Sequence, residues 1–185
     1  MSQIHINYVE DKLLKIPSWR ATYVLRPDLL ALSASLGQHG FIQPIHVRSS
    51  TMEVIDGSER VLLARNVKEI KKSCNGLIPV VEHDVDLFGA MMLHLQLNRA
   101  RGAMQAKNVS EIVRKLYMSG KYNKSHFDSM LCMKGEEFAL MLDGTLLKVR
   151  KIQEHNYAKA WVPVEAPPGT IDSAPLIERP PNKDR

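Results

Sequence analysis

The pattern of apolar and polar positions in the first part of the chain predicts short strands. Segment 42–48 is typical of a strand entered through Pro44, because a proline lacks the N–H of a ladder and suits a strand's start or edge. Segment 53–56 is typical of a second strand, and the polar residues 49–52 between them suit a turn. We therefore expect a β-hairpin, with a third strand at 77–82.

Segments with the apolar spacing of a helix lie between and around these strands. Segment 28–38 carries leucines at intervals of three and four, which places them on one face of a helix. Segments 58–69 and 86–97 show the same periodicity. Helices and strands that alternate in this way predict an α+β domain.

The chain changes character twice after this domain. Residues 103–160 show only helical periodicity. The candidate helices are 109–118, 125–131 and 134–141. They fit a helix-turn-helix that places one helix in a DNA groove, and they also fit a small helical cap. Six of the ten prolines lie in the last segment, so a flexible tail is expected. We divide the chain into a domain at 1–102, a helical region at 103–160 and a tail at 161–185.

Composition narrows the choice of partners only a little. The 185 residues carry a formal net charge of +5, which favours an acidic partner such as nucleic acid or nucleotide. Cys74 and Cys132 form no metal-binding spacing, so we expect reduced thiols. No apolar run approaches the roughly 18 residues of a membrane span, and no secretory signal is recognisable. We expect a cytoplasmic protein.

The segment Asp56-Gly57-Ser58-Glu59-Arg60 joins the second strand to a helix. Free N–H groups and the helix dipole at such a point attract anions. Gly57 allows a phosphate to approach the backbone, and Arg60 adds a charged contact. Asp56 and Glu59 are candidates to hold Mg²⁺ or to act on a hydroxyl. A plain strand-turn-helix with Asp56 as the N-cap explains the same segment.

Two flanking motifs favour the phosphate site: Gly40-x-x-Gln43-Pro44-Ile45 precedes it and Asn98-x-x-Arg101 follows it. In order and spacing, the three motifs together resemble those of ParB proteins, which carry G-x-x-Q-P-I, then G-E-R-R before a helix, then E-N-x-x-R. The matched positions are Gly40, Gln43, Pro44, Ile45, Gly57, Arg60, Asn98 and Arg101. The resemblance covers roughly residues 15–102 and places the chain in the ParB/sulfiredoxin superfamily, with a mixed-sheet domain.

This resemblance implies a nucleotide pocket. In ParB the motifs bind cytidine triphosphate and its metal, in the free serine kinase a D-G-H-H-R segment serves phosphoryl transfer, and in sulfiredoxin G-G-C-H-R carries a reactive cysteine. The implied ligand is ATP or CTP with Mg²⁺. The residues assigned to it are Arg20, Gln43, Pro44, Ile45, Gly57, Ser58, Arg60, Asn98 and Arg101.

The chain also departs from each of these families. Ser58 stands where sulfiredoxin needs its cysteine, so peroxiredoxin repair is not expected. Ser58 and Glu59 replace the two histidines of the kinase motif. Glu59 also replaces the first arginine of G-E-R-R, and Leu97 replaces the glutamate of E-N-x-x-R. The Asp-Gly start is closer to the kinase-like and the phage or prophage branch.

Several other side chains have two interpretations. Arg20 is placed to reach a phosphate, whereas Trp19 suits a packed aromatic. Arg48 either faces the pocket or is exposed at the strand end. His39 and His46 have no ligand-type partner nearby in sequence and suit surface or structural roles.

Three functions remain open from the sequence. The first is a nucleotide-dependent, DNA-associated protein of plasmid, phage or prophage type, with DNA contacted by the helical region and a basic run. That run contains Lys148, Arg150 and Lys151. The second is an enzyme that transfers or hydrolyses a phosphoryl group, or cleaves DNA, with Asp56 and Glu59. The third is an interaction module without chemistry, which regulates a protein partner through the helical region or the Pro-rich tail. A homodimer is compatible with all three.

Overall fold

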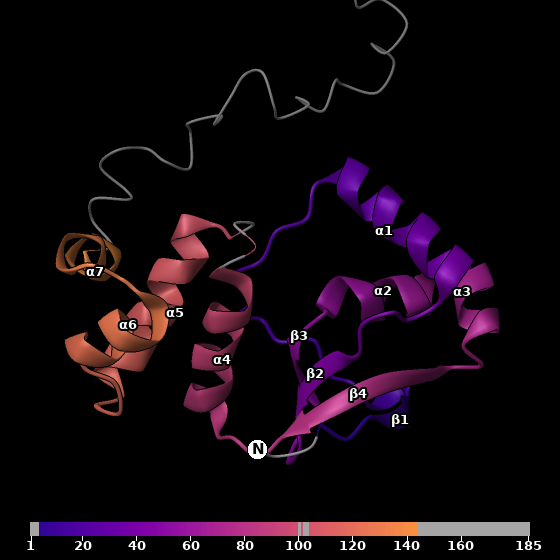
Figure 1. The fold of residues 1–185 in the computed structure, drawn as a ribbon, viewed down its shortest axis with the longest axis horizontal. Coiled ribbons are helices and arrows are strands. Elements are labelled where there is room, and N and C mark those ends of the chain that lie inside the picture. Colours follow the sequence, from indigo (N-terminus) through magenta and orange to yellow (C-terminus); the bar gives the residue numbers. More distant parts are fainter. Residues whose placement is uncertain (1–3, 100, 102–103, 144–185) are drawn as a thin grey trace, which may run out of the picture. The chain divides into compact units, whose positions relative to one another are not determined.

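A four-stranded mixed sheet forms the centre of the computed structural model (Figure 1), which describes residues 4–99, 101 and 104–143. The strands are β1 (Asn7–Glu10), β2 (Ile45–Arg48), β3 (Glu53–Asp56) and β4 (Leu77–His83). The sheet order is β1-β4-β2-β3. Strand β4 is parallel to β2 and antiparallel to β1, while β2 and β3 form the expected antiparallel hairpin. The α+β class with a mixed sheet is confirmed.

The helices form two groups on either side of the sheet. The first group is α1 (Arg26–His39), α2 (Ser58–Asn66) and α3 (Lys68–Ser73). The second group is α4 (Leu87–Arg99), α5 (Ala106–Met118), α6 (Lys124–Leu131) and α7 (Gly135–Leu142), and a short 3-10 turn, η1 (Asp11–Leu13), follows β1. Figure 1 shows α4 between the sheet and α5–α7. No helix among residues 4–99, 101 and 104–143 is long and apolar enough to cross a membrane.

Two apolar cores hold these layers together. One core joins α1–α3 to the sheet through residues such as Val47, Val54 and Ile78. The other joins α4 to α5–α7 and includes Ile55. Adjacent residues of β3 therefore enter different cores, as expected for a strand whose side chains alternate between its faces.

A register shift between His46 and Val47 disturbs the hairpin ladder. Val47 pairs with Val54, but His46 pairs with Asp56, so Ile55 is an extra residue on β3. Such a bulge bends the strand and redirects the side chains beyond it. Val54, Ile55 and Asp56 are all buried as a result, and Asp56 is held inside the molecule at the strand end.

The structure differs from the sequence prediction in two elements. The predicted helix 58–69 is interrupted at Val67, which has extended dihedral angles between α2 and α3. Asn and β-branched Val both have lower helix propensity than the residues around them. Strand β1 was not predicted, since its four residues are mostly exposed and show no clear alternation. The predicted helices at 109–118, 125–131 and 134–141 are present as α5, α6 and α7.

The tail at 161–185 and the basic residues Lys148, Arg150 and Lys151 lie outside the described residues. The described residues of both the α+β domain and the helical region belong to one compact unit.

Candidate functional site

The predicted passage from strand through glycine to helix is present at the end of β3. Gly57 has φ 96° and ψ 21°, a left-handed conformation that favours glycine, and α2 begins at the next residue. A Cβ on Gly57 would lie 2.6 Å from Cδ1 of Ile45 and 3.3 Å from Cζ of Arg60. The glycine is therefore required by close packing between the first two sequence motifs as well as by its dihedral angles.

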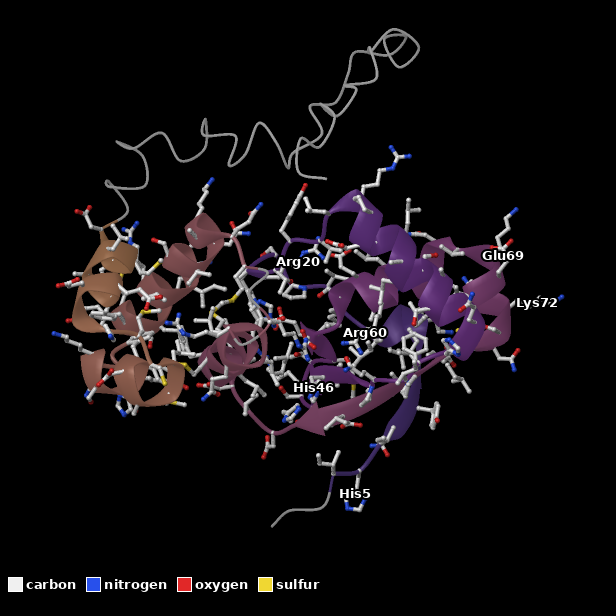
Figure 2. All side chains as sticks on the ribbon, turned by 45° about the horizontal axis from the view of Figure 1, so that its top comes forward. His5, Arg20, His46, Arg60, Glu69 and Lys72 are labelled. Atoms are coloured by element: carbon white, nitrogen blue, oxygen red, sulfur yellow. The ribbon has the colours of Figure 1, made fainter. Side chains whose placement is uncertain are left out.

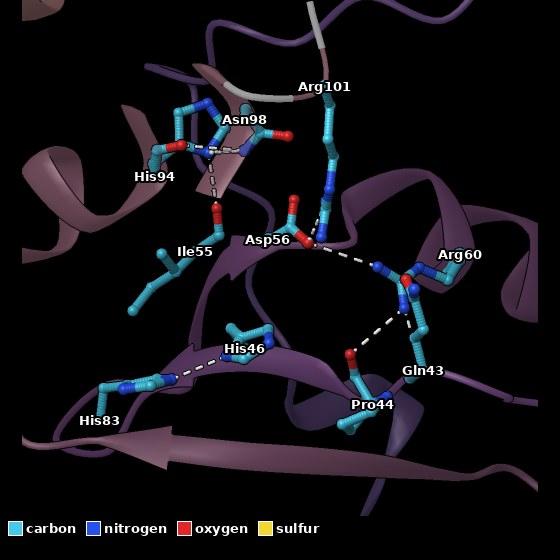
Figure 3. A network of polar contacts seen from close by, with 10 residues as sticks. All are labelled: Gln43, Pro44, His46, Ile55, Asp56, Arg60, His83, His94, Asn98 and Arg101. Atoms are coloured by element: carbon cyan, nitrogen blue, oxygen red, sulfur yellow. Dashed lines mark hydrogen bonds and ion pairs between the residues drawn. The ribbon is translucent and has the colours of Figure 1, made fainter. Parts of the chain in front are cut away.

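The carboxylate of Asp56 is the centre of the site (Figure 3). Its Oδ2 atom accepts hydrogen bonds from Nη1 of Arg101 at 2.9 Å and from Nη2 of Arg60 at 3.3 Å. Burial alone would raise the pKa of Asp56, but the hydrogen bond and charge of Arg101, then the charge of Arg60, lower it below its usual value. Asp56 is therefore an ionised internal anchor for two arginines from separate motifs.

The Arg60 side chain joins the first motif to the second. Its Nη1 atom donates to the backbone oxygens of Gln43 at 2.7 Å and Pro44 at 3.2 Å. The side chain is only 11% exposed, compared with 46% for Arg101. Arg60 is therefore largely engaged by protein acceptors, and Arg101 is the arginine of this pair that is open to a ligand.

A third arginine reaches the same helix end. Nη1 of Arg20 lies 2.7 Å from Oε1 of Glu59 in the first turn of α2. Figure 2 shows Arg20 and Arg60 near the middle of the molecule, whereas Glu69 and Lys72 project from the outer side of α3. Three guanidinium groups and two carboxylates thus gather where β3 meets α2, so the cluster has a net positive charge.

The two carboxylates proposed as metal ligands each have an arginine partner, Asp56 with Arg60 and Arg101, and Glu59 with Arg20. Within the part of the chain that the structure describes, no group of three or more His, Cys, Asp or Glu side chains is placed to hold a metal ion. Guanidinium groups outnumber carboxylates in the cluster. It fits a phosphate group better than it fits Mg²⁺.

A buried histidine that the sequence did not single out supports the site from α4. Nδ1 of His94 donates to the backbone oxygen of Ile55 at 2.6 Å, and Nε2 accepts from the backbone N–H of Ala21 at 2.9 Å. This tautomer is inferred from the two partners. Burial lowers the pKa of His94 below its ordinary value, so the ring is neutral. His94 ties the strand before Asp56 to the segment that carries Arg20.

Asn98, matched to the third motif, lies one turn further along α4. It is buried, and its Nδ2 atom donates to the backbone oxygen of His94 at 2.9 Å. Its side chain also adds a smaller contribution to the low pKa of Asp56. Asn98 is thus part of the internal support of the site. Ser58 is also buried, at the start of α2, and the N-cap of this helix is Gly57 and not Asp56.

The partner of His46 comes from a neighbouring strand. Nδ1 of His46 lies 2.8 Å from Nε2 of His83 on β4, with the two rings stacked. Burial, and then the charge of His83, lower the pKa of His46. This pair lies beside Asp56 in Figure 3, and its structural role matches the expectation for His46.

Two further candidates lie around Glu53 at the start of β3. Arg48 is ion-paired to Glu53 at 3.5 Å, and Nε1 of Trp19 donates to the same carboxylate at 3.2 Å. Trp19 is buried and meets the His94 ring edge-on, as expected for a packed aromatic.

A separate cavity of about 440 Å³ lies between the ends of α1 and α3 and the start of β4. Its lining includes Leu36, Phe41, Cys74 and Leu77, and does not include Asp56 or its arginines.

Comparison with known proteins gives one curated relative and several solved structures. No family model matches the chain. The relative is the uncharacterized protein YbdM of Escherichia coli (strain K12), 27% identical over 161 residues, which covers 83% of this chain and 74% of YbdM.

The similar solved structures are ParB proteins. A pNOB8-like ParB N-domain has 18% identity and a TM-score of 0.48, and the match covers 69% of this chain and just over half (53%) of that one. A C-terminally truncated ParB from Caulobacter crescentus, complexed to the centromeric parS site, has 16% identity and a TM-score of 0.49, with 73% and 69% covered. With TM-scores below 0.5, these likenesses carry no argument about function.

Proposed function

We propose that this protein binds the phosphate groups of a nucleotide, ATP or CTP, where β3 meets α2, and that it acts as a ParB-like protein in DNA transactions of plasmid, phage or prophage type. One observation carries the nucleotide proposal: the N-terminus of α2, capped by Gly57, is surrounded by three guanidinium groups. They belong to Arg20, Arg60 and Arg101. Backbone N–H groups at such a terminus and planar guanidinium groups are both suited to phosphate oxygens.

The three arginines have different tasks in this proposal. Arg60 holds the Gln43-Pro44 segment against α2 and so shapes the site. Arg101 and Arg20 have more exposed side chains and exchange part of their carboxylate contacts for phosphate oxygens when the ligand binds. Gly57 has no side chain and therefore lets Ile45 and Arg60 pack against the start of α2.

The electrostatics of Asp56 favour binding over proton transfer. A carboxylate whose pKa is lowered by two arginines is a weak general base near neutral pH. Glu59 is likewise occupied by Arg20. We therefore propose a binding site, and turnover of the nucleotide is an outcome that the experiment below can reveal.

The helical region has one feature that bears on DNA binding. Helices α6 and α7 are separated by three residues, as in a helix-turn-helix, but α7 contains two glutamates and no lysine or arginine. A helix without cations is poorly suited to a DNA groove. We propose that DNA is contacted mainly by the basic run that contains Lys148, Arg150 and Lys151.

A thermal-shift screen with ATP, ADP, CTP and GTP, with and without Mg²⁺, tests the nucleotide site. A ligand that binds only the folded protein raises its melting temperature. We expect Arg101→Gln to lower the affinity about 10- to 100-fold, since a charged hydrogen bond contributes about 1.5–3 kcal/mol. Lys72→Gln, an exposed cation on α3, is the matched control and should bind normally.

Two results would contradict the assignment of the site. One is unchanged affinity in both Arg101→Gln and Arg60→Ala, and the other is the absence of any nucleotide-dependent shift. Phosphate release in the same samples, abolished by Glu59→Gln, would favour an enzyme instead.

For DNA, we expect duplex binding to weaken with salt, and replacing Lys148, Arg150 and Lys151 by glutamine should reduce that salt dependence.

A further inference from the structure

The two more exposed arginines of the site, Arg20 and Arg101, are held in place by the helical region. For Arg20 the link is α5: Nδ2 of Asn108 donates to the backbone oxygen of Arg20 at 3.1 Å. The backbone N–H of Gln105, just before α5, donates to the oxygen of Ala21 at 2.9 Å. Thr22 and Met104 add an isolated antiparallel bridge. The segment that carries Arg20 is thus paired along its length with the start of the helical region.

For Arg101 the link is α7. Arg99, the last residue of α4, forms a two-pronged contact with Glu137, with nitrogen–oxygen distances of 2.9 and 2.8 Å. Arg101 follows two residues later, and its backbone N–H is bonded to the oxygen of Asn98 at 3.0 Å. The end of α4 is therefore fixed to α7 on one side, through Arg99, and to Asp56 on the other, through Arg101.

We propose that Asn108 of α5 and Glu137 of α7 are positioning residues of the nucleotide site, acting through Arg20 and Arg101. This inference rests on the proposed function. A backbone that is already fixed does not have to be ordered when the ligand binds, so less conformational entropy is lost on binding. The helical region is then part of the binding unit and not a separate module.

The reciprocal effect follows from linkage. If α5 and α7 improve ligand affinity, ligand binding must stabilise α5 and α7 by the same free energy. Hydrogen exchange of the amides in α5 and α7 should therefore slow when the ligand is added, although neither Asn108 nor Glu137 belongs to the cluster of side chains around Asp56.

The test measures calorimetric affinity for ATP, CTP and inorganic tripolyphosphate in the full chain. We expect Asn108→Leu to weaken binding about three- to tenfold and Glu137→Gln about two- to fivefold, the range of a single hydrogen bond or a half-exposed ion pair. Glu136→Gln, the neighbouring exposed glutamate, is the control for Glu137. Lys107→Gln is the control for Asn108. Both controls should bind normally.

Double-mutant cycles separate positioning from a general loss of structure. The effect of Asn108→Leu should largely disappear in an Arg20→Gln background, and that of Glu137→Gln in an Arg101→Gln background, because each acts through its arginine. Asn108→Asp, which keeps the side-chain shape, gives a second variant if the leucine variant does not fold.

Two results would overturn the inference while leaving the proposed function intact. They are wild-type affinity in both positioning variants, or effects that simply add to those of the arginine substitutions. If the wild-type chain binds none of the three probes, the proposed function fails and the inference fails with it.

Discussion

The two sides of the central sheet are built from different kinds of residue. On the side of α1–α3, the core consists of apolar side chains, and Ser58 at the start of α2 is the one buried polar residue of these three helices. On the side of α4, the buried side chains of His94 and Asn98 lie next to an apolar core and are hydrogen-bonded to backbone oxygens. Asp56, buried at the end of β3, is held by Arg60 and Arg101. Buried polar groups are costly unless they are paired, so this second side depends on geometry in a way that the first does not.

Stability and site geometry are therefore separable in this molecule. The apolar side contributes mainly by removing surface from water, which tolerates small shifts. The polar side requires that residues from β3, α4 and the segment around Arg20 keep their distances. Substitutions on each side should therefore give different combinations of stability and binding.

The largest expected effect is on stability alone. Ile78 of β4 is fully buried in the apolar core, so Ile78→Ala should lower the free energy of unfolding by about 2–5 kcal/mol. Urea denaturation measures this loss, and nucleotide affinity at a temperature where the variant is folded should remain that of the wild type. A change in affinity as large as that of Arg101→Gln would show that the two sides are not separable.

A substitution at the junction should affect both properties. Gly57→Ala places a methyl group against Ile45 in a left-handed backbone, at a cost of about 2–4 kcal/mol from strain and overpacking. It should also displace Arg60 and weaken nucleotide binding. Gly76→Ala is the matched control, since Gly76 also has a positive φ but no atom within 4 Å of the added carbon. Equal losses in the two variants would contradict the packing argument.

The smallest effect is a pH dependence of the polar side. Because burial lowers the pKa of His94 below 6.5, its neutral form stabilises the fold above that pH, and this stability is lost as pH falls through the lower folded-state value. We expect the His94 share of the loss on acidification to be about 1 kcal/mol, the contribution of the Ala21 hydrogen bond. His46 and His83, whose pKa values are also lowered by burial, add to the total loss. The free energy of unfolding, measured by denaturation between pH 7 and 5, should depend less on pH in His94→Gln than in the wild type. Exposed His39→Gln is the control.

The local part of this structure could be predicted from the sequence. The hairpin of β2 and β3 followed from apolar spacing and from the position of Pro44, and the helix α1 followed from leucine spacing. The junction at Gly57 followed in the same way, because a strand, a glycine and a helix start are encoded by neighbouring residues.

The long-range part could not be predicted from residue spacing. His94 fits an apolar helix pattern, and its two partners lie 39 and 73 positions away in the chain. Motif matching brought Arg60 and Arg101 to one site, but it gave no sign that Arg60 is occupied by the oxygens of Gln43 and Pro44. The Arg99–Glu137 contact depends on how α7 packs, which no local pattern encodes.

The hydrogen bond between Asn108 and the Arg20 oxygen has a consequence for biosynthesis. Its two residues are 88 positions apart, so the segment around Arg20 leaves the ribosome well before its partner exists. The hairpin of β2 and β3 needs only neighbouring residues and can form early, since loop closure is least costly for short loops. The anion site should therefore be among the last features to form. A nascent chain stalled before α5 should contain the folded hairpin but should not bind nucleotide.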